Sequence, residues 1–447
     1  MNLTLRSLLS SLLLTATCLA EKQSPNIVVF ISDDLGRLDT SIHGSKDVRT
    51  PTMDLLATRG MTFDDAYVAS PSCCPSRFSL LTGLMPARHG AHPNHSEVKP
   101  GTKFLMPILK KMGYHVASFG KIAHGNRDFE GMDFNNPKRT GMSVEVEKYF
   151  SQSKIDGPVC LLVGDRRPHV EWTKEMNYDP DKVTLPPFFI DTKETREHWA
   201  RYLTDIEGMD AEMGRVLKFA KKTFDDNFIF LFTSDHGGQW PFGKWNLYDY
   251  GTRVPLQVSW PGKIKAGTRT NAMVSWVDIL PTLIDLAGGK VPWGIDGKSF
   301  APVLLGQTKA HRDRIFTTNT GDKEMNVFPI RSVRIGKFKY IHNLRPDAYH
   351  TNHSDRLRSE SELAEIASSD GEAKAVNDML RHGIRDLLAM SMSPDIVADR
   401  CVEAIREKTF YILTHEQTVP ALQERVQQIV SGANPRQPSA GPENFIK

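Results

Sequence analysis

Long hydrophobic runs alternate with amphipathic segments over roughly the first two thirds of the chain. The run at residues 26–32 (NIVVFIS) is continuous and rich in β-branched side chains, which is typical of a strand buried on both faces. Similar runs predict strands at 114–119, 159–163, 228–233 and 254–259, and helical patterns lie between them at 52–59, 103–112, 195–221 and 276–286. This alternation predicts an α/β fold in which helices flank a large, mostly parallel sheet.

The pattern changes beyond residue 299. Residues 330–334 (IRSVR) and 337–342 (KFKYIH) predict two strands of a smaller antiparallel sheet, and the pattern turns helical from residue 359. We therefore expect four parts along the chain. They are a leader over 1–20, a main domain over 21–298, a small C-terminal subdomain over 299–358, and a helical tail over 359–447.

The leader has the pattern of a secretory signal peptide. Arg6 precedes a short apolar core at residues 8–14, and small residues lead to a cleavage position after Ala20. The core is too short to cross a bilayer, and no other segment is suited to do so, so we expect no membrane span. An exported protein is the prediction: periplasmic or extracellular in a bacterium, lysosomal or secreted in a eukaryote.

Composition narrows the classes of function. The 56 Lys and Arg residues against 53 Asp and Glu leave a net charge of +3, which gives no reason to expect a nucleic-acid partner. A hydrophobic share of 40% and a charged share of 24% exclude a disordered chain or a polytopic membrane protein. Five cysteines are too few for a disulfide framework in a protein of this size, so the adjacent pair Cys73-Cys74 needs another explanation.

Carboxylates and a histidine follow two of the predicted central strands. Asp33 and Asp34 come directly after the first strand, and Asp235 and His236 follow the strand at 228–233. The carboxyl ends of parallel strands meet at one edge of a sheet, so these side chains are expected to converge. Three carboxylates suit Ca²⁺, and the imidazole leaves another divalent cation possible. The sequence therefore predicts a metal site at this edge.

Residues 72–83 (SCCPSRFSLLTG) contain Cys-x-Pro-Ser-Arg followed by Leu-Thr-Gly. This composite motif resembles the type I, formylglycine-dependent sulfatase family of the alkaline phosphatase superfamily, and the resemblance covers residues 26–344. It implies an alkaline phosphatase-like fold and a sulfuric ester or sulfamate hydrolase. It also implies that a formylglycine-generating enzyme oxidises Cys73 to Cα-formylglycine.

The resemblance assigns roles to further residues. The hydrated aldehyde, a gem-diol, attacks sulfur beside the divalent cation, and loss of a proton from its second hydroxyl expels sulfate. Cys73 is expected just before a helix over 76–82, where free N–H groups favour anionic oxygen. Arg77 would brace the aldehyde and the metal ligands, and His124 would assist deprotonation of the diol. The implied general acid is His169, the sulfate-binding lysines are Lys121 and Lys244, and the implied metal ligands are Asp33, Asp34, Cys73, Asp235 and His236.

The implied substrate is a sulfated saccharide. Residues 239–255 and 330–333 resemble the heparan N-sulfatase branch, whereas the spacing within 121–124 and the Asp235-His236 pair resemble iduronate 2-sulfatase. Both branches act on glycosaminoglycans. Two alternatives stay open: a phosphonate or phosphodiester hydrolase of the same superfamily, and a non-catalytic binder of sulfated glycans. Candidate pocket-wall residues are His92, His95, Arg167, Trp172 and Trp240.

The resemblance does not extend to the end of the chain. The Asp-Pro-x-x-Glu element that normally closes these branches is absent, and residues 393–435 resemble the tail of a short-chain dehydrogenase. No Gly-rich dinucleotide loop precedes that segment, so we expect no reductase activity.

Overall fold

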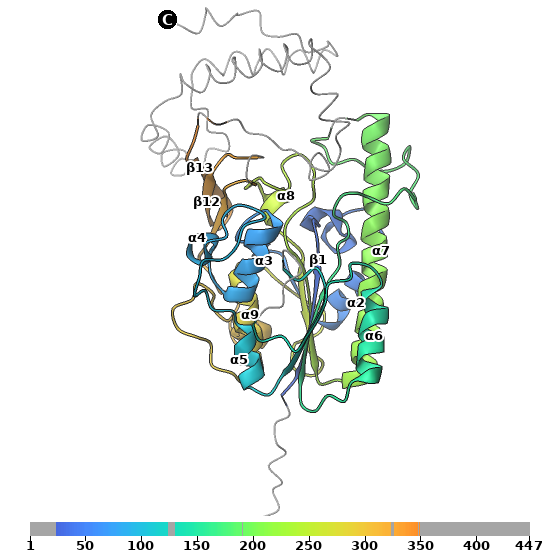
Figure 1. Cartoon of the computed structure of the whole chain (residues 1–447). Coiled ribbons are helices and arrows are strands. Elements are labelled where there is room, and N and C mark those ends of the chain that lie inside the picture. The colour runs from blue at the N-terminus through green and yellow to red at the C-terminus, as the bar shows by residue number, and fades with distance from the viewer. Residues whose placement is uncertain (1–23, 124–129, 190, 323–325, 347, 349–447) are drawn as a thin grey trace, which may run out of the picture. The chain divides into compact units, whose positions relative to one another are not determined.

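A mixed sheet forms the centre of the main domain in this computed structural model, which describes residues 24–123, 130–189, 191–322, 326–346 and 348 (Figure 1). The strand order is β5-β4-β6-β1-β7-β8-β2-β9. The five strands from β5 to β7 are parallel, and β8 runs antiparallel to both β7 and β2. The strands are β1 (Asn26–Ser32), β2 (Met61–Phe63), β4 (His115–Gly120), β5 (Phe134–Asn136), β6 (Val159–Gly164), β7 (Phe228–Ser234), β8 (Leu256–Ser259) and β9 (Thr268–Thr270).

Helices cover both faces of this sheet (Figure 1). Alternate side chains of β1 enter two different cores, because successive side chains of a strand point to opposite faces. Ile27 and Val29 pack with α3 (Cys73–Thr82), α5 (Met106–Lys111) and α9 (Ile279–Leu286). Val28 and Phe30 pack with α2 (Pro51–Arg59), α6 (Met142–Gln152) and α7 (Lys193–Phe224). Burial on both sides explains the unbroken hydrophobic run.

Helix α3 begins earlier than the sequence pattern predicts. Its first residue is Cys73, three positions before the expected start at 76. Pro75 lies in the first turn, where a missing N–H costs nothing because first-turn N–H groups have no acceptor within the helix. The helix ends at Gly83, whose φ of 67° is a left-handed conformation that glycine adopts without strain.

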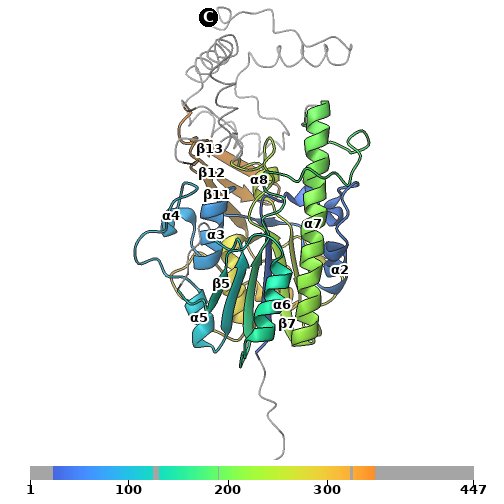
Figure 2. The same cartoon turned by 45° about the vertical axis from the view of Figure 1, so that its right-hand side comes forward.

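The small C-terminal sheet has three antiparallel strands, one more than predicted (Figure 2). They are β11 (Arg314–Asn319), β12 (Ile330–Ile335) and β13 (Phe338–Asn343). Ile330 packs with Trp245 and Leu247 of the loop after β7, and the N–H of Thr318 donates to the carbonyl of Ala69 at 2.9 Å. These contacts hold the small sheet close to the start of α3. The predicted α/β fold with an appended antiparallel sheet is confirmed.

Short elements complete the described part of the chain. They are η1 (Arg37–Asp39), η2 (Ser41–His43), β3 (Ala66–Tyr67), α4 (Pro86–His89), α8 (Asp249–Thr252), β10 (Val274–Ser275), η3 (Trp276–Asp278) and α10 (Ala301–Leu304). The leader and the tail, with its dehydrogenase-like segment, lie outside the described residues, and the four boundaries stay predictions. Within the described ranges, no helix combines the length and the apolar character needed to span a bilayer.

A buried carboxyl beneath the sheet edge gives a testable pH dependence. Asp39 accepts hydrogen bonds from the hydroxyls of Tyr202, at 2.8 Å, and Tyr250, at 3.0 Å. Burial raises the pKa of Asp39 to about 7, against the opposing effect of these two hydrogen bonds. The folded state then binds this proton more tightly than the unfolded state, so the free energy of unfolding falls as the pH rises from about 4 to 7.

We expect Asp39→Asn to remove this loss, which amounts to at most about 4 kcal/mol. The melting temperature of the variant should therefore exceed that of the wild type at pH 8, and the gap should close toward pH 4. Calorimetry across this range measures the difference, with Asp181→Asn at an exposed carboxyl as the control. A gap that does not change with pH would contradict the assignment.

Candidate active site

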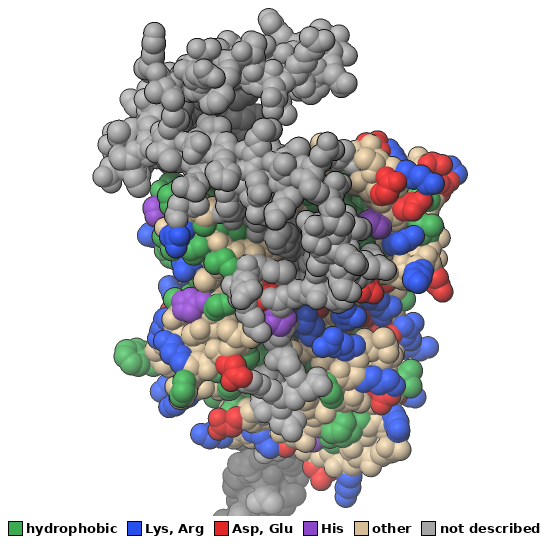
Figure 3. Space-filling model, turned by 45° about the horizontal axis from the view of Figure 1, so that its top comes forward, with side chains coloured by type: hydrophobic (Ala, Val, Ile, Leu, Met, Phe, Trp, Pro, Cys, Tyr) green, Lys and Arg blue, Asp and Glu red, His purple; other side chains and the backbone are tan. Residues whose placement is uncertain are grey.

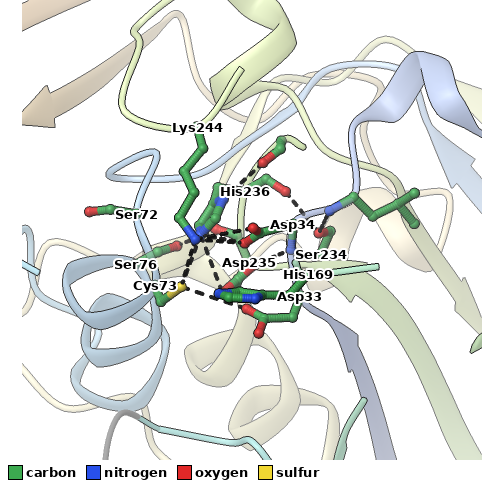
Figure 4. Close-up of polar contacts among 12 residues, drawn as sticks. Asp33, Asp34, Ser72, Cys73, Ser76, His169, Ser234, Asp235, His236 and Lys244 are labelled. Atoms are coloured by element: carbon green, nitrogen blue, oxygen red, sulfur yellow. Dashed lines mark hydrogen bonds and ion pairs between the residues drawn. The ribbon is translucent and has the colours of Figure 1, made fainter. Parts of the chain in front are cut away.

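The acidic residues after β1 and β7 meet at the carboxyl edge of the sheet (Figure 4). Ser32 pairs with Ser234 at the ends of these two parallel strands, and the next residues of both strands are buried. The N–H of Asp34 donates to Oδ1 of Asp235 at 3.1 Å. The side chains of Asp33, Asp34, Asp235 and His236 thus lie together, as the strand pattern predicts.

Cys73 faces this cluster from the first turn of α3. Its Sγ lies 3.3 Å from Nε2 of His236 and 3.7 Å from Oδ1 of Asp33. Burial raises the pKa of the Cys73 thiol well above its usual value, although Lys121 and Lys244 oppose the effect. The unmodified residue is therefore a neutral thiol, which is a poor nucleophile.

Arg77 ties the cluster to α3. It lies one helical turn after Cys73 and is completely buried. Its Nη2 donates to Oδ1 of Asp33 at 3.0 Å, its Nε donates to Oδ2 of Asp235 at 2.9 Å, and its Nη1 donates to the carbonyl of Lys121. Only the planar fork of a guanidinium can serve three acceptors in this arrangement, so lysine would not replace it.

Two lysines bring positive charge to the Cys73 sulfur. Nζ of Lys121 lies 2.6 Å from Oδ2 of Asp33 and 3.4 Å from Sγ of Cys73. Nζ of Lys244 lies 3.0 Å from Oδ1 of Asp34 and 3.5 Å from the same sulfur. Burial alone would lower the pKa of Lys121, but the Asp33 carboxylate raises it above its usual value.

Both members of the contact between Asp33 and Lys121 are ionised. Burial would raise the pKa of Asp33, but Lys121 and Arg77 hold it well below the usual value. Carboxyl groups and basic side chains therefore alternate around Cys73. The other members of this network are Asp34, Asp235 and Lys244.

The orientation of His236 fits a cation among the acidic side chains. Its Nδ1 lies 2.9 Å from the carbonyl oxygen of Gly237 and donates to it, so Nε2 is the nitrogen that faces the acidic side chains. That nitrogen lies 3.3 Å from Oδ1 of Asp34 and 3.5 Å from Oδ2 of Asp235. One potential ligand atom from each of Asp33, Asp34, Cys73, Asp235 and His236 lies within 4.8 Å of all the others. The donor set of carboxylate oxygens with one imidazole nitrogen therefore suits a divalent cation.

Tight backbone packing holds His236 in place. A Cβ on Gly237 would lie 1.8 Å from the carbonyl oxygen of Tyr250, a distance that no side chain can accept. The glycine after His236 thus allows the loop after β7 to approach α8. This close approach fixes the acceptor that orients the imidazole.

The other predicted site residues have mixed outcomes. Figure 4 draws His169 beside Asp33, and the charge of His169 contributes to the lowered pKa of that carboxyl. His124 lies outside the described residues. Arg167 forms an ion pair with Asp165 at 2.6 Å, so much of its hydrogen-bonding capacity is used within the protein.

The two tryptophans proposed as pocket walls contact each other. The rings of Trp172 and Trp240 stack with centroids 4.6 Å apart and an interplanar angle of 14°. Trp240 is largely buried and also packs against Trp199 and Tyr202. This aromatic cluster supports the loop that precedes Lys244.

Sequence reasoning missed Asn94. Its Oδ1 accepts the N–H of Cys74 at 2.9 Å, and its own N–H donates to the carbonyl of Gly321 at 2.9 Å. The N-cap residue of α3, Ser72, makes no side-chain capping bond, so Asn94 satisfies a first-turn N–H from a distant loop. No local pattern signals such a contact, because the two partners are twenty residues apart.

Comparisons with known proteins identify the family. The Sulfatase family model matches residues 25–289, and the model described as N-sulphoglucosamine sulphohydrolase, C-terminal, matches residues 236–389. An ulvan-active sulfatase of Formosa agariphila is 30% identical over 352 residues, covering 74% of this chain and 68% of the relative. Human N-sulphoglucosamine sulphohydrolase is 28% identical over 386 residues, covering 74% of this chain and 76% of the relative.

Solved structures share the fold. A protein in complex with its substrate D-glucosamine-2-N,6-O-disulfate matches with a TM-score of 0.61 at 19% identity, over 81% of this chain and 99% of the other. A 2-O glycosaminoglycan sulfatase matches with 0.65 at 22% identity, over 81% and 93%. A phosphonate monoester hydrolase of Agrobacterium radiobacter matches with 0.63 at 18% identity, over 81% and 96%.

The fold and the buried cluster fit the alkaline phosphatase-like superfamily. The chain belongs to the sulfatase family and is a sulfuric ester hydrolase. This membership confirms the resemblance to the sulfatase family.

Proposed function

We propose that this enzyme removes sulfate from a sulfated saccharide of the glycosaminoglycan type. The observation that carries the proposal is the position of Cys73, whose Sγ has Nζ of Lys121 at 3.4 Å and Nζ of Lys244 at 3.5 Å. Two cationic side chains beside the nucleophile position are suited to bind an anionic sulfate group. Named relatives support the substrate class, since one is active on ulvan and another is N-sulphoglucosamine sulphohydrolase.

The proposal includes two groups that this chain would acquire. Cys73, oxidised to Cα-formylglycine by a formylglycine-generating enzyme, would supply the oxygen nucleophile of a hydrated aldehyde. A divalent cation, Ca²⁺ by preference, would supply positive charge to a sulfate oxygen. The residues that would hold this cation are Asp33, Asp34, Asp235, His236 and the modified Cys73.

Other side chains of this enzyme would bind the sulfate, hold the carboxylates in position and transfer protons. Lys121 and Lys244 would bind the sulfate oxygens, and Arg77 would hold Asp33 and Asp235 in position. His169 would donate a proton to the leaving atom, and His124 would receive one at the nucleophile. The first-turn N–H groups of α3 add partial positive charge where the anion binds.

Within the family, we propose the N-sulfated glucosamine branch. The support is the match of residues 236–389 to the C-terminal model of N-sulphoglucosamine sulphohydrolase, together with the relative of that name. Export through the leader over 1–20 is part of the same proposal, since it would give access to extracellular or lysosomal polysaccharide.

The test is release of inorganic sulfate from N-, 2-O- and 6-O-sulfated saccharides, with enzyme produced alongside the converting enzyme. We expect release from the N-sulfated sugar. Treatment with EDTA should lower the rate about a thousandfold, because the metal contributes several kcal/mol of charge stabilisation, and added Ca²⁺ should restore it.

An aryl phosphodiester and a phosphonate monoester serve as competing substrates in the same assay. Faster turnover of either than of any sulfate would favour the phosphonate hydrolase alternative. Binding of heparin without sulfate release, when mass spectrometry confirms conversion of Cys73, would favour a non-catalytic binder. Full activity in EDTA would contradict the metal assignment.

A further inference from the structure

Arg331 of β12 is a half-buried cation with no carboxylate partner in the described ranges of the chain. Among the described residues, its guanidinium bonds only to two carbonyl oxygens: Nη1 donates to Asn319 at 2.9 Å and to Ile330 at 2.8 Å. Two other arginines of the same sheet are paired, Arg334 with Asp249 and Arg314 with Asp313 at 2.8 Å. A partly desolvated guanidinium with unused donors is suited to bind an anion.

Buried amides without partners lie in the same region. Neither Oδ1 nor Nδ2 of Asn319 has a hydrogen-bond partner in the described part of the protein, although the residue is 1% exposed. Nδ2 of Asn94 also has no hydrogen-bond partner among the described residues. Buried polar atoms are almost always hydrogen-bonded in native proteins, so these three atoms have unused capacity to bind water or a ligand.

Hydrogen bonds connect this region to the nucleophile position. Asn94 accepts the N–H of Cys74 at 2.9 Å and donates its own N–H to the carbonyl of Gly321 at 2.9 Å. Gly321 follows the end of β11, where Arg331 binds the carbonyl of Asn319. The end of the small sheet therefore lies next to the residue that follows Cys73.

The charges around this region are mainly positive. Burial lowers the pKa of His92, and the nearby charges of Arg331 and Lys99 lower it further. The carboxylate of Asp322 is 3.0 Å from Nδ1 of His95 and forms an ion pair with that ring. Histidine side chains also lie among lysines and arginines on the face seen in Figure 3.

We propose that Arg331 and the amide of Asn319 form a second anion subsite, which binds an additional sulfate or carboxylate of the saccharide whose first sulfate is removed at Cys73. This inference rests on the proposed function and deepens it, because such a subsite would favour polyanionic sugars over singly sulfated ones. Arg331 would supply charged donors, and Asn319 would supply an amide to a neighbouring sugar hydroxyl or to the anion itself.

Binding to an inactive enzyme tests the subsite without turnover. In a Cys73→Ala background, we expect Arg331→Gln to weaken binding of D-glucosamine-2-N,6-O-disulfate about ten- to a hundredfold in calorimetry, as loss of a charge-assisted hydrogen bond implies. Arg331→Lys should restore part of the affinity. The matched control is Arg314→Gln on β11, an exposed arginine paired with Asp313, which should leave affinity unchanged.

Kinetics on three substrates show whether the subsite binds a sulfate or a carboxylate, and they test the subsite separately from the proposed function. Arg331→Gln in the active enzyme should raise KM for the disulfated sugar if the subsite binds sulfate. It should raise KM for a uronate-bearing disaccharide if the subsite binds carboxylate. It should leave 4-nitrophenyl sulfate, which has one anion, within about twofold. Equal losses on all three substrates, or unchanged calorimetric affinity, would overturn the subsite. Wild-type enzyme that cleaves aryl sulfate alone would overturn the saccharide function instead.

Discussion

Cys73→Ala is expected to reduce sulfate release by about 10⁵-fold or more, since loss of a covalent nucleophile removes the reaction path itself. The fold should survive, because the substitution removes one buried sulfur from a helix and alanine favours helical backbone. Sulfate release measured by ion chromatography, together with the melting temperature of each protein, checks both parts.

Cys74→Ala is the matched control for this prediction. Cys74 is the next residue of the same helix and is equally buried, but its Sγ lies 3.0 Å from the carbonyl oxygen of Ser96 and not in the acidic cluster. We expect this variant to keep most of its activity and to lose similar stability. An active Cys73→Ala enzyme, or an inactive Cys74→Ala enzyme, would place the nucleophile elsewhere.

Arg77→Met is expected to lower the free energy of unfolding by about 3–5 kcal/mol, because Asp33 and Asp235 would lose a buried partner. Activity should fall by about a thousandfold or more, since both carboxylates would leave their positions beside Cys73. Urea denaturation in metal-free buffer measures the stability loss, and the sulfate assay measures the rate.

Arg314→Met provides the comparison for Arg77. Its ion pair with Asp313 is exposed and screened by solvent, so the loss of stability should be much smaller than at Arg77. Added Ca²⁺ should recover part of the stability of the Arg77→Met enzyme, since the cation would offset the same two carboxylates. An Arg77 variant as stable as the Arg314 variant would mean that the buried network contributes little.

The sequence predicts the parts of the fold that depend on burial at both faces of a sheet. β1 occupies residues 26–32 as predicted, because an unbroken apolar run has no other stable place than the centre of the sheet. Short strands such as β3 and β10 have only two residues each, so their formation depends on tertiary pairing with each other. Two residues are too few to show the alternation of hydrophobic and polar side chains that predicts a strand.

The candidate site also has a part that the sequence predicts and a part that it does not. Asp33 and Asp235 are predictable because each directly follows a buried parallel strand, and strand ends meet at one edge. The contacts of Asn94 and Arg331 are not predictable, because each joins a side chain to a backbone group outside its own helix or strand, and no local pattern marks such a pair. The match of residues 330–333 to a known branch indicated the segment but gave Arg331 no role.

The burial of Cys73 also constrains when the enzyme can mature. Cys73 is 1% exposed, and Pro75, Ser76 and Arg77 of the same motif are buried with it in the folded protein. An enzyme that oxidises Cys73 would need contact with these buried residues. We therefore expect the proposed oxidation to precede the packing of α3 into the core.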